Sequence, residues 1–334
     1  MLALTNACNL ACLHCYREEA AAFPDELGPM EIVRVLREFG DLAAAEGRAG
    51  VVIFSGGEPL LSRLLGLYAR TALGLGLGVR INTNAILATP AVSAGLFAWG
   101  IRFAQVSLDG ATPEEHEAIR GGGTWELTRR GVVNLLAAGV DVAFKVTLIP
   151  GRNDRDPAGY LRVARAWGVG RVSFARAVEI GPAGKLGRYT PEAYRQVLER
   201  LAAGRDLAER SSVRDFRRVK SVIAEIRDAT FDRSFLTGEA LSYQSEEGHS
   251  ILAVDADGSV YGSRRLPLRL GNVREASLAD LWRHPLLSAF RDSRRAGKCE
   301  RCDLLAACRG GSRAAAWSAT GDPAAPDPGC WVEP

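Results

Sequence analysis

Several features that define other classes of protein are missing from this 334-residue sequence. It has no run of about 18 apolar residues, which argues against a transmembrane helix. It has no basic leader before a long apolar stretch, which argues against a signal peptide. The formal net charge is only +3, so electrostatics give no reason to expect nucleic acid or a membrane as the main partner. We therefore expect a globular cytoplasmic protein, with one large domain and a smaller one or with two medium ones.

Cysteine is absent between positions 16 and 298, although the chain has seven cysteines. They form two groups near the two ends of the sequence: Cys8, Cys12 and Cys15, then Cys299, Cys302, Cys308 and Cys330. In a reducing compartment, clustered cysteines indicate metal ligands or catalytic thiols before they indicate disulfides. Both groups are therefore candidate metal sites.

The first half of the chain alternates short apolar runs with amphipathic stretches. Strands are expected over residues 2–5, 51–55, 79–84, 103–109, 140–148 and 171–177. Helices are expected over 29–47, 64–76, 91–99, 124–138 and 156–167. Repeated β–α alternation of this length predicts an α/β protein with a parallel barrel or a doubly wound sheet.

The pattern changes after residue 177. Residues 190–228 have a helical pattern, 250–263 a hairpin pattern with Asp257-Gly258 as its turn, and 277–284 the pattern of a short helix. The last forty residues are loop-rich, so a bound metal could supply part of their stability. We predict a core over 1–180, a helical linker region over 181–248 and a small cluster-binding domain over 249–334.

The N-terminal cysteines occupy one loop after the first expected strand. Thiolates bind zinc or iron–sulfur clusters, and a closed site takes four protein ligands. Three thiolates leave one coordination position open, and a catalytic metal site needs such an open position for its ligand or substrate. The alternative is a structural zinc site completed by His14 or by a distant cysteine.

The spacing C-x3-C-x2-C of Cys8, Cys12 and Cys15, after a first strand in a (β/α)6 pattern, resembles the radical S-adenosylmethionine (SAM) superfamily. The resemblance implies a partial (β/α)6 TIM-like barrel and a [4Fe-4S] cluster on these three cysteines. SAM then chelates the fourth iron, and its reductive cleavage gives methionine and a 5′-deoxyadenosyl radical that abstracts hydrogen from the substrate. His14 stands where this family usually has an aromatic residue.

A second motif, Gly56-Gly57-Glu58-Pro59, follows the second strand and resembles the GGEP motif that contacts the SAM amino group in that family. Two glycines allow a close backbone approach, and a glutamate can accept from an ammonium group.

Three further candidates for SAM binding lie at or beyond strand ends, where barrel enzymes build their sites: Asn84, Ser107 and Arg120. In relatives, the positions matching Ser107 and Arg120 contact the SAM ribose or carboxylate. The alternatives are a turn role for Asp109 and a surface ion pair for Arg120. Lys145 and Arg176 either point into the barrel mouth or are salt-bridged there, and no catalytic residue is assigned.

The four C-terminal cysteines alone fit zinc or a cubane cluster equally well. Their pattern, C-x2-C-x5-C with CRGG and a late cysteine, resembles the SPASM extension of radical SAM enzymes, whose full form has seven cysteines and two auxiliary clusters. Here Ser263 and Ser312 replace two of those cysteines. The resemblance therefore implies that the ligands of auxiliary cluster I are missing and those of auxiliary cluster II are complete, and we expect two [4Fe-4S] clusters in total.

The absent thiols raise the question of what occupies their place. Ser263, Ser312, Tyr243 and His249 are candidates to line a substrate cavity there. Nearby arginines, Arg264, Arg265 and Arg269, either suit a carboxylate-rich substrate or form a solvated basic loop.

These resemblances favour an enzyme that crosslinks, oxidises or epimerises a peptide or protein. The alternative is maturation of a tetrapyrrole or another small molecule, for example by oxidative decarboxylation. A non-enzymatic iron–sulfur or zinc protein is disfavoured, because it needs neither GGEP nor an open iron. We expect an electron donor such as flavodoxin or ferredoxin. Because the chain begins seven residues before Cys8, we also expect that any leader-peptide recognition would need a separate partner protein.

Overall fold

The computed structural model describes residues 1–17, 21–209, 223–226, 247–291, 297–303 and 305–333. Ten strands of this part form one sheet, in the order β10-β9-β8-β1-β2-β3-β4-β5-β6-β7. The first six run parallel to their neighbours and confirm the predicted alternation: β1 (Leu2–Ala3), β2 (Val51–Ser55), β3 (Gly78–Thr83), β4 (Phe103–Ser107), β5 (Asp141–Leu148) and β6 (Arg171–Arg176).

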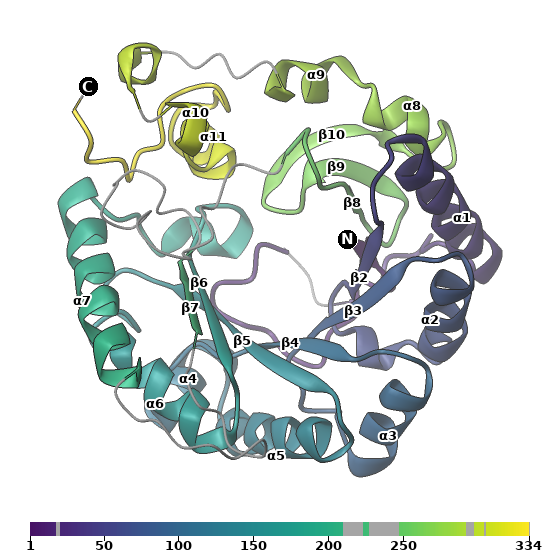
Figure 1. The fold of residues 1–334 in the computed structure, drawn as a ribbon, viewed down its shortest axis with the longest axis horizontal. Helices are drawn as coiled ribbons and strands as arrows, with labels where there is room; N and C mark the ends of the chain where they lie inside the picture. The colour runs from purple at the N-terminus through teal and green to yellow at the C-terminus, as the bar shows by residue number, and fades with distance from the viewer. Residues whose placement is uncertain (18–20, 210–222, 227–246, 292–296, 304, 334) are drawn as a thin grey trace.

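The helices of this region cover the outside of the strands, which curve into an incomplete ring (Figure 1). They are α1 (Pro29–Ala45), α2 (Leu65–Gly74), α3 (Pro90–Ala98), α4 (Pro113–Arg120), α5 (Thr124–Ala137) and α6 (Pro157–Trp167). The helix α3 begins at a proline after Thr89, whose side chain accepts from the Val92 amide, a favourable start for a helix. The partial parallel barrel predicted from the sequence is therefore confirmed.

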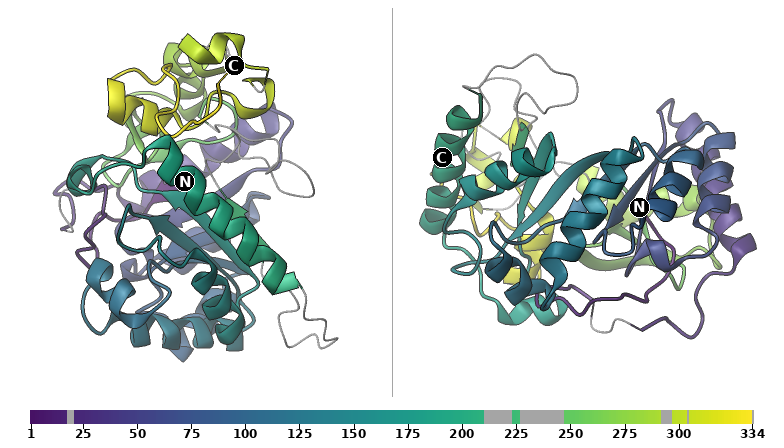
Figure 2. Two further views of the ribbon diagram at one scale, coloured as in Figure 1. Left: turned by 90° about the vertical axis from the view of Figure 1, so that its left-hand side faces the viewer. Right: turned by 90° about the horizontal axis from the view of Figure 1, so that it is seen from below.

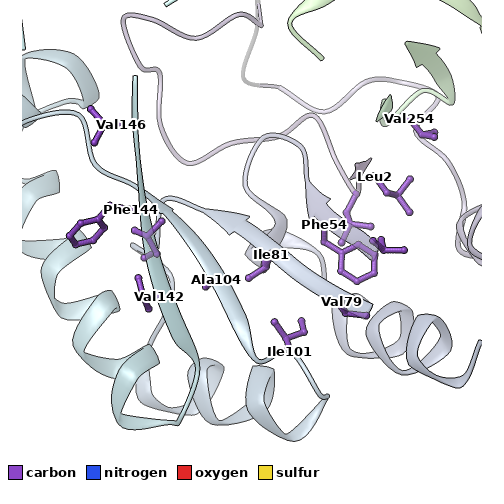
Figure 3. Packing of buried hydrophobic residues seen from close by; sticks show 14 of the residues in the cluster. Leu2, Phe54, Val79, Ile81, Ile101, Ala104, Val142, Phe144, Val146 and Val254 are labelled. Atoms are coloured by element: carbon purple, nitrogen blue, oxygen red, sulfur yellow. The ribbon is translucent and has the colours of Figure 1, made fainter. Parts of the chain in front are cut away.

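The apolar core lies between the strands and these helices. Phe54, Ile81, Ala104 and Phe144 are fully buried there (Figure 3). Because side chains of a strand alternate between its two faces, the neighbours of Ala104 in β4 face the other way, into the interior of the ring. The fold thus has an apolar layer between the strands and the helices, and an inner surface whose side chains are available to bind a ligand.

The chain after the barrel extends the same sheet. Strands β8 (Ala253–Val254), β9 (Ser259–Ser263) and β10 (Leu266–Asn272) form an antiparallel meander, and β8 pairs in parallel with β1. The predicted turn at Asp257-Gly258 is confirmed, because Gly258 has φ +84° and its amide donates to the Asp255 carbonyl at 2.9 Å.

The helical pattern predicted over 190–228 is only partly correct. Helix α7 spans Pro191–Glu209, but Ile223–Ile226 form strand β7, which pairs in parallel with β6. The prediction of helix at 223–226 was wrong because pairing with an adjacent strand overrides a weak local preference. The helical linker region predicted over 181–248 thus contributes a strand to the sheet of the core.

The C-terminal part contains more helix than its loop-rich sequence predicts. The predicted short helix is α8 (Leu278–Trp282), and it is followed by α9 (Pro285–Arg291), η4 (Gly297–Arg301), α10 (Leu305–Cys308) and α11 (Arg313–Thr320). Helix α8 packs against α1, where the Leu278 amide donates to Glu38 Oε2 at 2.9 Å. Helices α10 and α11 lie near α7 (Figure 1 and Figure 2), and the rings of Tyr194 and Trp331 are 6.2 Å apart. None of the helices in the described ranges is long and apolar enough to span a lipid bilayer.

Candidate active site

A cavity of about 1530 Å³ occupies the interior of the ring. Its lining brings together the loop of the N-terminal cysteines, the motif at 56–58, inward-facing residues of the parallel strands and residues 263–265, which end β9 and follow it. All three N-terminal cysteines line it, so segments that are distant in sequence meet around one space. Parallel strands place their carboxyl ends on one side, which is why such residues converge there.

The loop of the N-terminal cysteines is fixed by backbone hydrogen bonds. The amide of Cys15 donates to the Cys12 carbonyl at 3.1 Å, and the amide of Leu13 donates to the Ile119 carbonyl at 2.9 Å. Ile119 belongs to α4, a helix that the sequence analysis did not predict. Its start signals were present, since Thr112 caps it and Pro113 is its first residue.

The two glycines of the GGEP motif are required by packing against the same N-terminal segment. The Gly57 amide donates to the Thr5 carbonyl at 2.9 Å. A Cβ atom on Gly57 would lie only 1.9 Å from the Ala7 carbonyl oxygen. Gly56 has φ +133°, which favours glycine. The close backbone approach expected of these glycines is therefore made, in this structure, to the segment that leads into Cys8.

Glu58 is buried and connects the ends of two strands. Its carboxylate accepts from the Thr83 hydroxyl at 2.7 Å, from the Asn84 amide at 2.9 Å and from the Leu60 amide at 3.0 Å. Burial raises the pKa of Glu58, and these hydrogen bonds oppose the increase. An ionised carboxylate has about four acceptor positions, so Glu58 keeps capacity for a ligand in the cavity that it lines.

Of the other predicted SAM-binding residues, some line the cavity and Pro59 does not. Asn84 and Ser107 line the cavity, and the Asn84 side chain donates to Asn9 Oδ1 at 2.8 Å, which links the end of β3 to the cysteine loop. Pro59 is buried at the start of η1 (Pro59–Leu61) and is not part of the described lining.

Arg120 lines the cavity as part of a buried ionic network. Its Nε lies 2.6 Å from Asp109 Oδ2, and its Nη1 lies 3.8 Å from Cys12 Sγ. His14 Nε2 lies 3.2 Å from the same carboxylate oxygen. Burial alone would raise the pKa of Asp109, but Arg120 and His14 outweigh it and hold the pKa well below its usual range. Arg120 is thus in a buried ion pair beside the cysteine loop, whereas the alternative from sequence was a surface pair.

We predict that Asp109→Asn lowers the free energy of unfolding by about 3–5 kcal/mol, because it leaves the buried charge of Arg120 without its partner. Since the pKa of Asp109 is lower in the folded than in the unfolded state, its contribution is present above the unfolded value of about 3.9 and is lost as the pH falls through the folded value. A lower stability of D109N than of the wild type should therefore still be present at pH 5, measured by anaerobic urea denaturation of the cluster-loaded protein.

The matched control is Glu126→Gln, which removes the carboxylate of an exposed pair with Arg129, 2.8 Å away. Solvent screens such a pair, so the denaturation midpoint should not change. Equal midpoints for D109N and the wild type would show that the buried network contributes no stability.

The residues present fit a thiolate-bound cluster. Burial raises the pKa of Cys12 to about 11, with Arg120 opposing the increase, so the unloaded thiol is protonated at neutral pH and metal binding must displace its proton. In the described part of the chain, no three His, Cys, Asp or Glu side chains converge where one metal ion could bind, whereas a cubane offers a separate iron to each thiolate.

The four C-terminal cysteines also come together. Cys299, Cys302, Cys308 and Cys330 surround a small cavity of about 20 Å³ with apolar neighbours such as Leu305 and Val332. Burial raises the pKa of Cys330 to about 11. This cavity shares no described lining residue with the large one, so the two cysteine groups lie at two separate places in the fold.

Arg176 connects the barrel to the C-terminal site. Its guanidinium forms a buried ion pair with Asp327, and the Asp327 carbonyl accepts from the Cys330 amide at 3.0 Å. Both alternatives for Arg176 therefore hold, because it lines the cavity and is salt-bridged. Lys145 also lines the cavity, with Nζ 3.5 Å from the Ser173 hydroxyl.

The residues near the missing thiols have different environments. Ser263 lines the cavity, Ser312 caps α11 by accepting from the Ala315 amide at 3.2 Å, and His249 is outside the lining described. Tyr243 lies outside the described residues. Of the three arginines, Arg264 and Arg265 line the cavity and Arg269 is exposed, so only the first two have the position that a substrate contact requires.

Comparison with known families gives two matches. Residues 2–164 match the model of the radical SAM superfamily, and residues 246–303 match that of SPASM, an iron–sulfur cluster-binding domain. The second match includes Cys299 and Cys302 and ends before Cys308.

Similar curated proteins include an AdoMet-dependent heme synthase of Methanosarcina barkeri (strain Fusaro / DSM 804), 28% identical over 99% of this chain and 95% of that protein. They also include the mycofactocin maturase MftC of Mycolicibacterium smegmatis (strain ATCC 700084 / mc(2)155), 29% identical over 98% of this chain and 81% of that protein. Among solved structures, Streptococcus suis SuiB bound to the precursor peptide SuiA matches with a TM-score of 0.74 at 16% identity, covering 99% of this chain and 75% of that one.

Proposed function

Because the chain belongs to the radical SAM superfamily and is an enzyme with a SPASM-type C-terminal extension, we propose that it modifies a peptide or protein by crosslinking, oxidation or epimerisation. Its cofactors are a [4Fe-4S] cluster, SAM and an auxiliary iron–sulfur cluster. When bound, the first cluster supplies the electron that cleaves SAM reductively and so provides the radical for hydrogen abstraction.

The size of the cavity is the main support for a peptide substrate. Pockets for single small ligands typically measure about 300–1,000 Å³, and this cavity measures about 1530 Å³. It has to hold SAM and the substrate together, and the remaining space suits a segment of chain. Two of the similar proteins support this, since one is a mycofactocin maturase and one was solved with a precursor peptide.

The residues of the chain have distinct tasks in this proposal. Cys8, Cys12 and Cys15 hold the first cluster, and Arg120 lies beside Cys12 with its charge balanced by Asp109. Glu58 and Asn84, fixed to each other at the ends of β2 and β3, and Ser107 at the end of β4 bind SAM. Because Glu58 and Asn84 are held by hydrogen bonds before the ligand arrives, their side chains lose little conformational entropy when SAM binds.

The four C-terminal cysteines hold the auxiliary cluster. They lie around their own small cavity, which suits a closed site with four protein ligands. The ion pair of Arg176 and Asp327 joins the C-terminal segment to strand β6 of the barrel and so fixes the position of this site. An electron donor such as flavodoxin or ferredoxin supplies the reducing equivalent.

A second candidate is the maturation of a tetrapyrrole. It is favoured by the heme synthase, which matches this chain over almost its whole length. It is also favoured by the charge of the cavity lining, whose described residues include more lysines and arginines than acidic residues; the acidic ones are Glu46, Glu58 and Glu247. A substrate with several carboxylates would suit such a surface.

Anaerobic reconstitution tests the radical chemistry and the number of clusters. We expect about eight irons per chain, for two cubane clusters, and release of 5′-deoxyadenosine on reduction with SAM. Bound zinc without absorption near 400 nm would contradict the reaction and both clusters. Mass spectrometry of products formed from peptide libraries and from Fe-coproporphyrin III then separates the two candidate functions.

A further inference from the structure

Two guanidinium groups meet in the cavity at a place that the SAM site does not use. Arg17 follows the loop of the N-terminal cysteines, and Arg264 follows strand β9. Both line the cavity, together with Ser263. The sheet order places β9 two strands beyond β1, on the side away from β2, β3 and β4, whose ends carry the proposed SAM contacts.

These groups carry buried donors that have no partner among the residues that the structure describes. The Arg264 side chain is only 4% exposed, and its Nη2 lies 3.0 Å from Asp255 Oδ1. Five further donors are buried and have no hydrogen-bond partner in the described part of the chain: Nε and Nη1 of Arg264, both terminal nitrogens of Arg17 and the Ser263 hydroxyl. Buried charged donors are costly to leave unsatisfied, so the arrangement points to a ligand that accepts from all of them.

Among the described residues, few groups compensate the charge of these guanidiniums. Asp255 is the carboxylate that pairs with Arg264. The Tyr16 ring lies 5.4 Å from the same guanidinium. Among the described residues, the pairing with Asp255 thus leaves most donors of the two guanidiniums open to a ligand.

We propose that Arg17, Arg264 and Ser263 form a subsite that binds a carboxylate group of the substrate. A guanidinium presents its donors in a planar fork that matches a carboxylate, and the serine hydroxyl adds a third donor. The inference rests on the proposed function, because it assumes that the cavity takes a substrate beside SAM. Peptides and porphyrins both carry carboxylates, so the subsite serves either candidate.

Binding to the cluster-loaded enzyme with SAM tests the subsite. The probes are acetyl-trialanine with a free carboxylate and as its carboxamide, and Fe-coproporphyrin III as the free acid and as its amide. Hydrogen bonds to a charged group make about a tenfold or larger preference for the acid reasonable. We expect this preference for at least one of the two scaffolds, and loss of it to below about twofold in Arg17→Gln and Arg264→Gln, with the affinity for the amide retained.

Arg269→Gln is the matched control, because Arg269 lies on the same segment but is exposed and donates to the Gly271 carbonyl. It should keep the preference for the acid. Equal binding of acid and amide to the wild type, binding of neither acid, or a preference that survives in both variants overturns the subsite. So does a loss of SAM affinity as large as the loss of acid affinity, which would assign the arginines to SAM.

The same measurements separate the subsite from the proposed function. A preference confined to Fe-coproporphyrin III supports the subsite and counts against a peptide substrate. A preference for the peptide acid supports both. The wild-type pairs of acid and amide test the anion preference without any variant, so a substitution that prevents folding does not remove the test.

Discussion

Cys12→Ala is expected to abolish SAM cleavage. Cys12 is the central cysteine of a three-thiol loop, and its sulfur lies 3.8 Å from the buried Arg120. Two remaining thiolates cannot hold a cubane that needs three protein ligands and one position for SAM. We expect 5′-deoxyadenosine to fall below detection in an anaerobic assay with dithionite. The iron content should fall from about eight to about four per chain, because the C-terminal site is separate.

Leu13→Ala is the matched control for this substitution. Leu13 is next to Cys12, its side chain is 37% exposed, and its loop position is fixed through its backbone amide. The variant should therefore keep about eight irons, as two cubane clusters require, and should keep its cleavage activity. Cleavage by C12A at the wild-type rate would exclude this loop as the site of the SAM-binding cluster.

The sequence was sufficient for the elements that are defined by local pattern. Strand β2 was predicted with its observed bounds, because five residues with a continuous apolar run are typical of a buried parallel strand. Helix α1 was predicted from Ile32, Leu36 and neighbours at helical spacing. Cysteine positions likewise predicted two separate groups of thiols, and the structure places the two groups around different cavities.

Features that depend on contacts between distant segments were not predictable in this way. Glu58 is held by Thr83 and Asn84, about 25 residues later. Asp109 had the local signature of a turn residue, and only the fold brings it to His14 and Arg120. A buried network of this kind leaves no trace in hydrophobic periodicity, because its members are polar and belong to different elements.

The dependence on distant contacts also explains why residues 223–226 were predicted as helix and why helix α4 was not predicted. Residues 223–226 became a strand through pairing with β6, which no local propensity encodes. Helix α4 has only eight residues, so its capping signals were the sole local indication. Both lie at places where the barrel contacts other segments, and α4 holds the cysteine loop through the Ile119 carbonyl.

Cys302→Ala is expected to separate SAM cleavage from product formation. Cys302 lies in the C-terminal cavity, which shares no residue with the large cavity, so loss of its thiolate should leave the first cluster and about four irons in place. We expect 5′-deoxyadenosine to form at a reduced rate, within about tenfold of the wild type, an added barrier of about 1.4 kcal/mol. Turnover of the modified product, measured by mass spectrometry, should be lost.

Glu333→Gln is the control for the C-terminal site, because the Glu333 side chain is 86% exposed and lies 3.8 Å from Lys298 near the cysteines. It should change neither cleavage nor product. The two outcomes that contradict the prediction differ in meaning. If C302A forms product at the wild-type rate, the auxiliary cluster only stabilises the C-terminal segment. If C302A loses SAM cleavage as well, the path from the electron donor to the first cluster runs through the C-terminal site, and the link from Cys330 through Asp327 to Arg176 becomes part of that path.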